Sequence, residues 1–198
     1  EKLRKKSHIL LGRYLADQMS EVYSLQQHRK AFCLGNIMPD LRPSFLTTRH
    51  EFFGTFSQLQ EKMRELIERN PEEDNARVYW RRFGEVMHYM ADYFTFPHNR
   101  TYKGSLAEHN SYEAELKNCL KECILSGNAD SQLEEAKHFD SFEELVGYIR
   151  ERHACYLESP RCIADDIRFI LRVCYQVIQG IFQLCLRRQF HMEGRPVT

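Results

Sequence analysis

The sequence has no excess of charge of either sign. Lys and Arg together number 28, as do Asp and Glu, so the formal net charge is zero when histidine is neutral. No whole-molecule field therefore attracts nucleic acid or an anionic membrane. Because nucleic-acid affinity depends on neutralising phosphates with a basic surface, nucleic acid is not an expected partner.

The cysteines lack the pattern of a secreted, disulfide-bonded scaffold. Their number is seven, and an odd count excludes a complete disulfide framework. The basic start, residues 1–6, leads into an amphipathic stretch that contains Arg13 and Asp17, and not into an uninterrupted apolar run. We therefore expect no signal peptide in the given residues, and a cytoplasmic protein.

Long uninterrupted hydrophobic runs are also missing. The most apolar segment, residues 163–186, is broken by Asp165, Asp166, Arg168 and Arg172. A membrane span tolerates such charges poorly. We predict a buried core helix there and no transmembrane segment.

No stretch alternates with period two, whereas apolar residues recur at helical spacing along almost the whole chain. A chain of 198 residues is long enough for one well-buried core. These features predict an all-α fold, a single multi-helix domain over residues 1–198. The expected helices cover residues 2–25, about 50–68, about 75–92, about 105–125, 141–156 and 159 onward, with a long loop at 33–48.

Particular residues mark the expected helix ends. Asp74 or Asn75 can cap the helix that leads to residue 92. Ser141 and Glu144 have the spacing of a capping box, and Ser159-Pro160 has the form of a cap followed by an N1 proline.

What the sequence does have is nine histidines, several of them paired with carboxylates. His88 and Asp92 are four residues apart, as are His109 and Glu113, and this spacing places each pair on one helix face. His98 follows a proline between the two pairs. Imidazole nitrogens and carboxylate oxygens are the ligands that bind zinc. The central segment therefore predicts a metal site.

Three further candidates precede this segment: His8, Asp40 and His50. Eight ligands are too many for one ion and suit a cluster of two or three. Taken singly, each histidine is more often a hydrogen-bonded core or surface residue, but the ordered set favours metal binding. Cys119 and Cys123 are also four apart, although two small buried hydrophobes are the better interpretation of that pair.

The order of these residues resembles the zinc-dependent phospholipase C family, whose distant relatives are the single-strand-specific zinc nucleases. The family pattern is an early helical His, an Asp in a long loop, a later His, His-x-x-x-Asp, a His ten positions after that first His, and His-x-x-x-Glu. Here the pattern reads His8, Asp40, His50, His88, Asp92, His98, His109 and Glu113. The resemblance covers about the first 115 residues.

The resemblance implies three metal positions in one cleft. The first ion would have Asp40, His50, His88 and Asp92 as ligands, the second His98, His109 and Glu113, and the third His8 with Asp92. In the family an N-terminal tryptophan completes the ligands of the third ion, and residue 1 here is a glutamate. The expectation is therefore two or three zinc ions.

The chemistry implied is hydrolysis of a phosphodiester or phosphomonoester by metal-bound hydroxide. Two ions about 4 Å apart can clamp the phosphate and lower the pKa of a bound water toward about 7. Asp40 would orient or deprotonate that water, and the substrate would be a small phosphoester or a phospholipid.

Choline lipids are not favoured among these substrates. The choline-preferring members place aromatic residues where this chain has Leu41 and Thr47, and the aromatic cage for a quaternary ammonium is absent at those positions.

Two alternatives stay open from the sequence. One is a non-catalytic helical protein that binds the same ions, and the other is a phosphodiesterase like the zinc nucleases. The pattern does not predict an oligomeric state.

Overall fold

The computed structural model describes residues 4–42, 51–69, 75–160 and 162–193, and within these ranges every regular element is helical. This confirms the predicted all-α fold. The α-helices are α1 (Arg4–Gln18), α2 (Tyr23–Gln27), α3 (Arg29–Gly35), α4 (Phe52–Glu68), α5 (Ala76–Tyr93), α6 (Leu106–Leu125), α7 (Asn128–Gln132), α8 (Phe142–Glu158) and α9 (Ile163–Glu193), and two 3₁₀ helices are η1 (Pro39–Leu41) and η3 (Phe96–His98).

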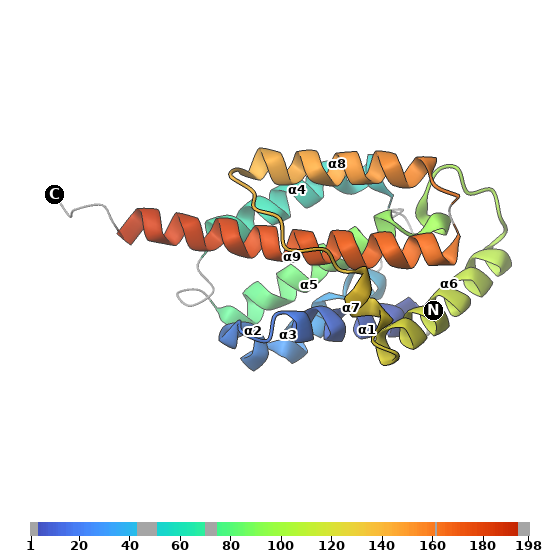
Figure 1. Cartoon of the computed structure of the whole chain (residues 1–198), viewed down its shortest axis with the longest axis horizontal. Helices are drawn as coiled ribbons and strands as arrows, with labels where there is room; N and C mark the ends of the chain where they lie inside the picture. The colour runs from blue at the N-terminus through green and yellow to red at the C-terminus, as the bar shows by residue number, and fades with distance from the viewer. Residues whose placement is uncertain (1–3, 43–50, 70–74, 161, 194–198) are drawn as a thin grey trace.

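Helix α9 is the long central element around which the others pack. Figure 1 shows α4 and α8 along one side of it and α1, α2, α3 and α5 along the other. By length and composition, residues 163–190 could cross a membrane, but 61 % of the most apolar stretch is buried within the fold. Its middle contributes fully buried residues such as Leu171, Val177 and Ile181 to the core. This burial favours the predicted core helix.

The prediction of one helix over residues 2–25 was wrong. Helix α1 ends at Gln18, and two short helices, α2 and α3, follow it. The side-chain amide of Gln26 donates to the carbonyl oxygens of Ala16 (2.8 Å) and Met19 (3.1 Å), which also accept from the backbone amides of Met19 and Val22. These bonds hold α2 against the end of α1. The sequence does not reveal this break, because apolar residues recur at helical spacing both before and after the turn that follows α1 and pack against the same core.

The predicted loop at 33–48 was also partly wrong. Its first residues, Cys33 to Gly35, complete α3, and Pro39 begins the 3₁₀ helix η1. Residues 43–48 lie outside the described part of the chain.

The predicted helix ends met mixed outcomes. Asn75 caps α5, since its side chain accepts from the amide of Val78 at 3.2 Å. The Ser141 hydroxyl accepts from the amide of Glu144, as predicted, but the Glu144 carboxylate bonds the amide of Asp140. The prediction that Ser159-Pro160 starts the last helix was wrong. Ser159 follows α8, where its hydroxyl donates to the Tyr156 carbonyl, and α9 begins at Ile163.

Helices α3 and α5 cross with their backbones in direct contact. A Cβ atom on Gly84 would overlap the carbonyl oxygen of Phe32, and one on Gly35 would overlap that of Arg81. Only glycine permits so close an approach. The crossing brings the chain after α3, which leads to Asp40, against the middle of α5.

One buried carboxylate connects α9 to the segments that follow α5. Asp166 accepts hydrogen bonds from the amide of Phe96 (2.9 Å) and the hydroxyl of Tyr112 (2.9 Å), and from the hydroxyl of Tyr156 (2.6 Å). Burial raises the pKa of Asp166 to about 6 although these three donors favour the ionised form. Asp166 thereby fixes η3 and α6 relative to each other.

The glycine contact gives a direct test of this architecture. We expect Gly84→Ala to lower the free energy of unfolding by about 1–3 kcal/mol, because the added methyl group must push α3 away from α5. Chemical denaturation followed by circular dichroism measures the change. The matched control is Gly147→Ala in α8, where a Cβ meets no atom within 4 Å. That variant should gain up to about 1 kcal/mol from its better helix propensity. Equal effects of the two substitutions would contradict the proposed role of the crossing.

Candidate metal centre

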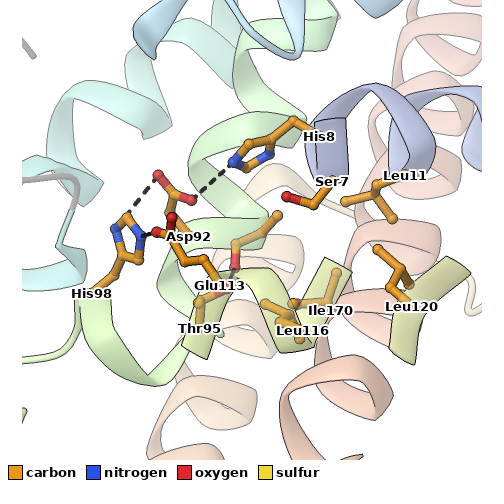
Figure 2. Close-up of a pocket in the computed structure, with 11 residues that line it drawn as sticks. Ser7, His8, Leu11, Asp92, Thr95, His98, Glu113, Leu116, Leu120 and Ile170 are labelled. Carbon is orange, nitrogen blue, oxygen red and sulfur yellow. Dashed lines mark hydrogen bonds and ion pairs between the residues drawn. The ribbon is translucent and has the colours of Figure 1, made fainter. Parts of the chain in front are cut away.

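Residues far apart in the sequence converge between α1, α5, η3 and α6. Helix α1 carries His8, α5 carries His88 and Asp92, η3 ends with His98, and α6 carries His109 and Glu113. Figure 2 shows Asp92 between His8 and His98, with Glu113 beside His98. The predicted ligand His50 lies outside the described residues.

The first group consists of His8, His88 and Asp92, all buried. Asp92 Oδ1 is 3.2 Å from His8 Nε2, and Asp92 Oδ2 is 3.2 Å from His88 Nε2. With zinc–ligand bonds of about 2.0–2.1 Å, tetrahedral ligands lie about 3.3 Å apart. The first group therefore has the spacing that a zinc ion needs. The resemblance assigned His8 and His88 to different ions that share Asp92, and in the structure Asp92 is close to both histidines.

The second group consists of His98, His109 and Glu113, which the resemblance also grouped together. Glu113 Oε1 is 3.2 Å from His98 Nε2 and 2.7 Å from His109 Nε2. The other ring nitrogen of His98, Nδ1, is 3.7 Å from Asp92 Oδ2. The two groups are therefore neighbours, joined through His98 and Asp92.

A backbone carbonyl sets the tautomer of His88. Its Nδ1 is 2.8 Å from the carbonyl oxygen of Asn36, which can only accept, so Nδ1 carries the hydrogen. The lone pair of the neutral ring is then on Nε2, which faces Asp92. Such a support behind a ligand fixes the ring and raises its basicity.

The electrostatics of the two stacked imidazoles differ. Their ring centroids are 4.0 Å apart. Burial, with the neighbouring His88, lowers the pKa of His8 and keeps it neutral. Burial also acts to lower the pKa of His88, but Asp92 and Asp40 outweigh it and the net pKa is raised. A neutral His8 is in the form that binds a metal.

Asp40 joins the cluster at the Nε2 side of His88, where Asp92 also lies. Its Oδ1 is 3.7 Å from His88 Nε2, and its Oδ2 is buried without a hydrogen-bond partner. A buried carboxylate oxygen without a partner is costly unless a cation offsets its charge. The donor set, neutral imidazoles with carboxylates, and this orphaned oxygen both fit zinc.

The pocket beside these groups is small and has two unlike ends. Its volume is about 30 Å³, which is roughly the volume of one water molecule in the liquid. His8, Asp92, His98 and Glu113 form the polar end, and Leu11, Leu116, Leu120 and Ile170 form the apolar end (Figure 2). The space suits an ion or a water and is too small for a whole substrate.

Sequence reasoning missed two supporting residues. Asn36 acts through its backbone carbonyl, which has no side-chain signal. Asp166 acts from α9, 68 residues after His98 along the chain, and holds η3 and α6 rather than contacting the ligands themselves. The Cys119–Cys123 pair packs against the hydrophobic core, as expected of small apolar residues.

Comparison with known proteins agrees with this arrangement. The family model described as zinc dependent phospholipase C matches residues 7–163. The match spans both groups and extends well beyond residue 115, through α8. No curated protein and no solved structure gives a significant match. An all-helical fold with two adjacent His–carboxylate groups, matched by this model over most of its length, identifies the chain as a member of the zinc-dependent phospholipase C family.

Proposed function

We propose that the protein is a zinc-dependent hydrolase that cleaves a phosphodiester or phosphomonoester. The observation that carries this proposal is the contact between the two groups. Asp92 Oδ2 is near both His88 and His98, so one buried carboxylate borders two candidate ion positions. Paired metal positions a few ångströms apart are the arrangement that phosphoester hydrolysis uses.

The proposed ligands are those that the geometry brings together. His8, His88 and Asp92, with Asp40 beside them, would hold zinc in the first group, and His98, His109 and Glu113 would hold it in the second. When bound, zinc supplies positive charge that stabilises the phosphate and makes a water more acidic.

Asp40 is the proposed proton acceptor. Its buried Oδ2 has no hydrogen-bond partner, so it is available to orient a water and take its proton. Asp92, by contrast, has an oxygen near each of His8 and His88, which suits a ligand better than a base.

The family supports a phosphoester or phospholipid as substrate. Leu41, which directly follows Asp40, is 50 % exposed and aliphatic, so this position cannot contribute to an aromatic choline cage. Thr47 lies outside the described residues. We therefore propose a headgroup other than choline.

The two-group arrangement predicts how zinc content responds to substitution. The wild-type protein should bind at least two zinc ions. His109→Ala should lose the ion of the second group. Asp92→Ala should lose more zinc than the loss of one group's ion accounts for, because Asp92 borders both groups. Elemental analysis after gel filtration measures these numbers. His138→Ala is the control, because its exposed ring lies with Asp140 and Arg187, away from both groups.

Zinc removal should also destabilise the fold. If zinc is present at a hundred to a thousand times its dissociation constant, a chelator should lower the free energy of unfolding by about 3–4 kcal/mol per site. An unchanged zinc content in Asp92→Ala would contradict the proposal that the Asp92 carboxylate borders two zinc positions.

The catalytic role of Asp40 predicts a selective loss of activity. Asp40→Asn should lower kcat by about 10²–10⁴-fold, because the amide cannot accept the proton. Zinc in the second group should remain. The control Asp17→Asn changes an exposed aspartate that pairs with Arg29, and it should retain full activity.

The assay that tests hydrolysis itself is a substrate panel with and without chelator: phospholipid vesicles, a nitrophenyl phosphodiester and single-stranded DNA. Cleavage of DNA with lipid left intact would support the nuclease-like alternative. A zinc-loaded protein that leaves every substrate intact is a binding protein and not an enzyme.

A further inference from the structure

A second pocket, lined mainly by cations, lies between α4, α5 and the chain after η1. We call it the basic pocket, and its volume is about 320 Å³, near the lower end of the range of about 300–1,000 Å³ for small-molecule sites. Its lining residues are Arg42, Lys62, Glu65, Leu66, Arg69, Arg81, Arg82 and Glu85. Five cations face two carboxylates, so the wall has an excess of three positive charges.

The two carboxylates are already engaged by cations of the wall. Buried Glu85 accepts from Arg42 at 2.7 Å and from Lys62 at 3.3 Å. Glu65 is 3.3 Å from Arg82. Within the described part of the chain, Arg69 and Arg81 have no carboxylate partner.

Arg81 is the residue that most needs an anion. Its Nε is buried and has no hydrogen-bond partner. An unsatisfied donor on a charged group is costly. The guanidinium group presents several donors in a fixed plane that matches the oxygens of a phosphate group.

Other pockets also have an excess of cations, since the one between α1 and α3 is lined by Arg13, Arg29 and Lys30 and by no carboxylate. Another pocket between α8 and α9 also contains several cations, but there Arg152, Arg168 and Arg172 each pair with a carboxylate, those of Glu151, Asp165 and Glu134. A buried Nε without a hydrogen-bond partner occurs both here and in the basic pocket, at Arg152 and at Arg81. Among the described residues, the basic pocket differs from the pocket between α8 and α9 in that two of its arginines, Arg69 and Arg81, have no carboxylate partner.

We propose that the basic pocket binds a phosphate group, either free or as a monoester on the substrate's headgroup. The pocket adjoins the candidate metal centre along the chain. Glu85 precedes His88 by one turn of α5, and Arg42 follows Asp40 by two residues. Arg81 precedes His88 by seven residues, so a phosphate held there would lie about 10 Å along α5 from a phosphoester held at the metals. Phosphate binding itself does not depend on the proposed hydrolysis.

Phosphate binding can be measured directly by isothermal titration calorimetry on the zinc-loaded protein. Inorganic phosphate should bind at a site that Arg81→Met weakens about 10- to 100-fold, the loss expected for a charge-assisted hydrogen-bonded pair. Arg69→Met, an exposed position at the rim, should weaken it in the same direction. Raising the ionic strength should weaken binding in the wild type as well, because the attraction is screened.

The matched control is Arg168→Met, which removes an arginine that already pairs with Asp165. It should bind phosphate as the wild type does. Zinc content must stay unchanged in all three variants, so that any phosphate bound at the metals is constant. Circular dichroism checks their folding, and Arg69→Met provides the test if Arg81→Met does not fold. Unchanged phosphate affinity in a folded Arg81→Met or Arg69→Met variant would overturn the proposal.

Kinetics separates the two sources of the phosphate. If it belongs to the substrate, Arg81→Met should raise KM for a phosphodiester that carries an additional phosphomonoester, with little change in kcat and no change for the plain phosphodiester. If it is free, added phosphate should alter turnover of the plain phosphodiester more in the wild type than in the variant, where only phosphate bound at the metals can act. This arm rests on the proposed hydrolysis. If Arg81→Met loses the calorimetric signal and the wild-type protein hydrolyses no substrate, the result would support phosphate binding in the basic pocket and count against the proposed enzymatic function.

Discussion

The backbone contact between α3 and α5 is the constraint on which the candidate metal centre depends. Gly35 and Gly84 allow the two helices to approach until Cβ atoms would overlap carbonyl oxygens. Asn36 follows Gly35 directly, and its carbonyl oxygen reaches His88 Nδ1 because the helices lie this close. The same crossing brings η1, with Asp40, to the Nε2 side of the ring. Two glycines, which have no side-chain atoms to contact a ligand, thus fix the orientation of His88, one helical turn after Gly84.

The fold concentrates carboxylates where water cannot solvate them. Asp92 and Glu113 are buried, and the Asp40 side chain is 5 % exposed. Buried carboxylates so close together repel each other, and histidines relieve this repulsion only when protonated. Burial and His88 lower the pKa of His8, so this ring offers little positive charge, and only His88, whose pKa Asp92 and Asp40 raise, can offset part of the repulsion. Bound cations resolve the conflict, because they neutralise the carboxylates and use the neutral rings as ligands. The arrangement is therefore consistent with a metal centre and costly as a simple network of hydrogen bonds.

The sequence predicted those parts of the site that depend on local geometry. The His88–Asp92 and His109–Glu113 pairs follow from helix periodicity alone, and the structure has both pairs in contact. The grouping of His98 with His109 came from the family resemblance, since spacing alone does not determine how η3 folds back onto α6. The hydrogen bonds of Asp166 join residues 54 and 70 positions apart, and no local pattern indicates them. The end of α1 was hidden for a similar reason, because Gln26 of the next helix bonds the carbonyl oxygens of Ala16 and Met19, ten and seven residues before it.

The zero net charge predicted the absence of a whole-molecule field, but it says nothing about how charge is distributed. Two sites of opposite character lie along the same stretch of α5. His88 is near the buried carboxylates of Asp40 and Asp92, whereas Arg81 and Arg82 line a pocket with surplus cations. Before zinc binds, the carboxylates repel a phosphoester, and a cationic wall nearby offsets part of that repulsion. Because the two fields act over short distances, attraction of the proposed phosphoester substrate would depend on this local arrangement. A chain with no overall charge can therefore present a phosphate-binding surface on one side of a single helix.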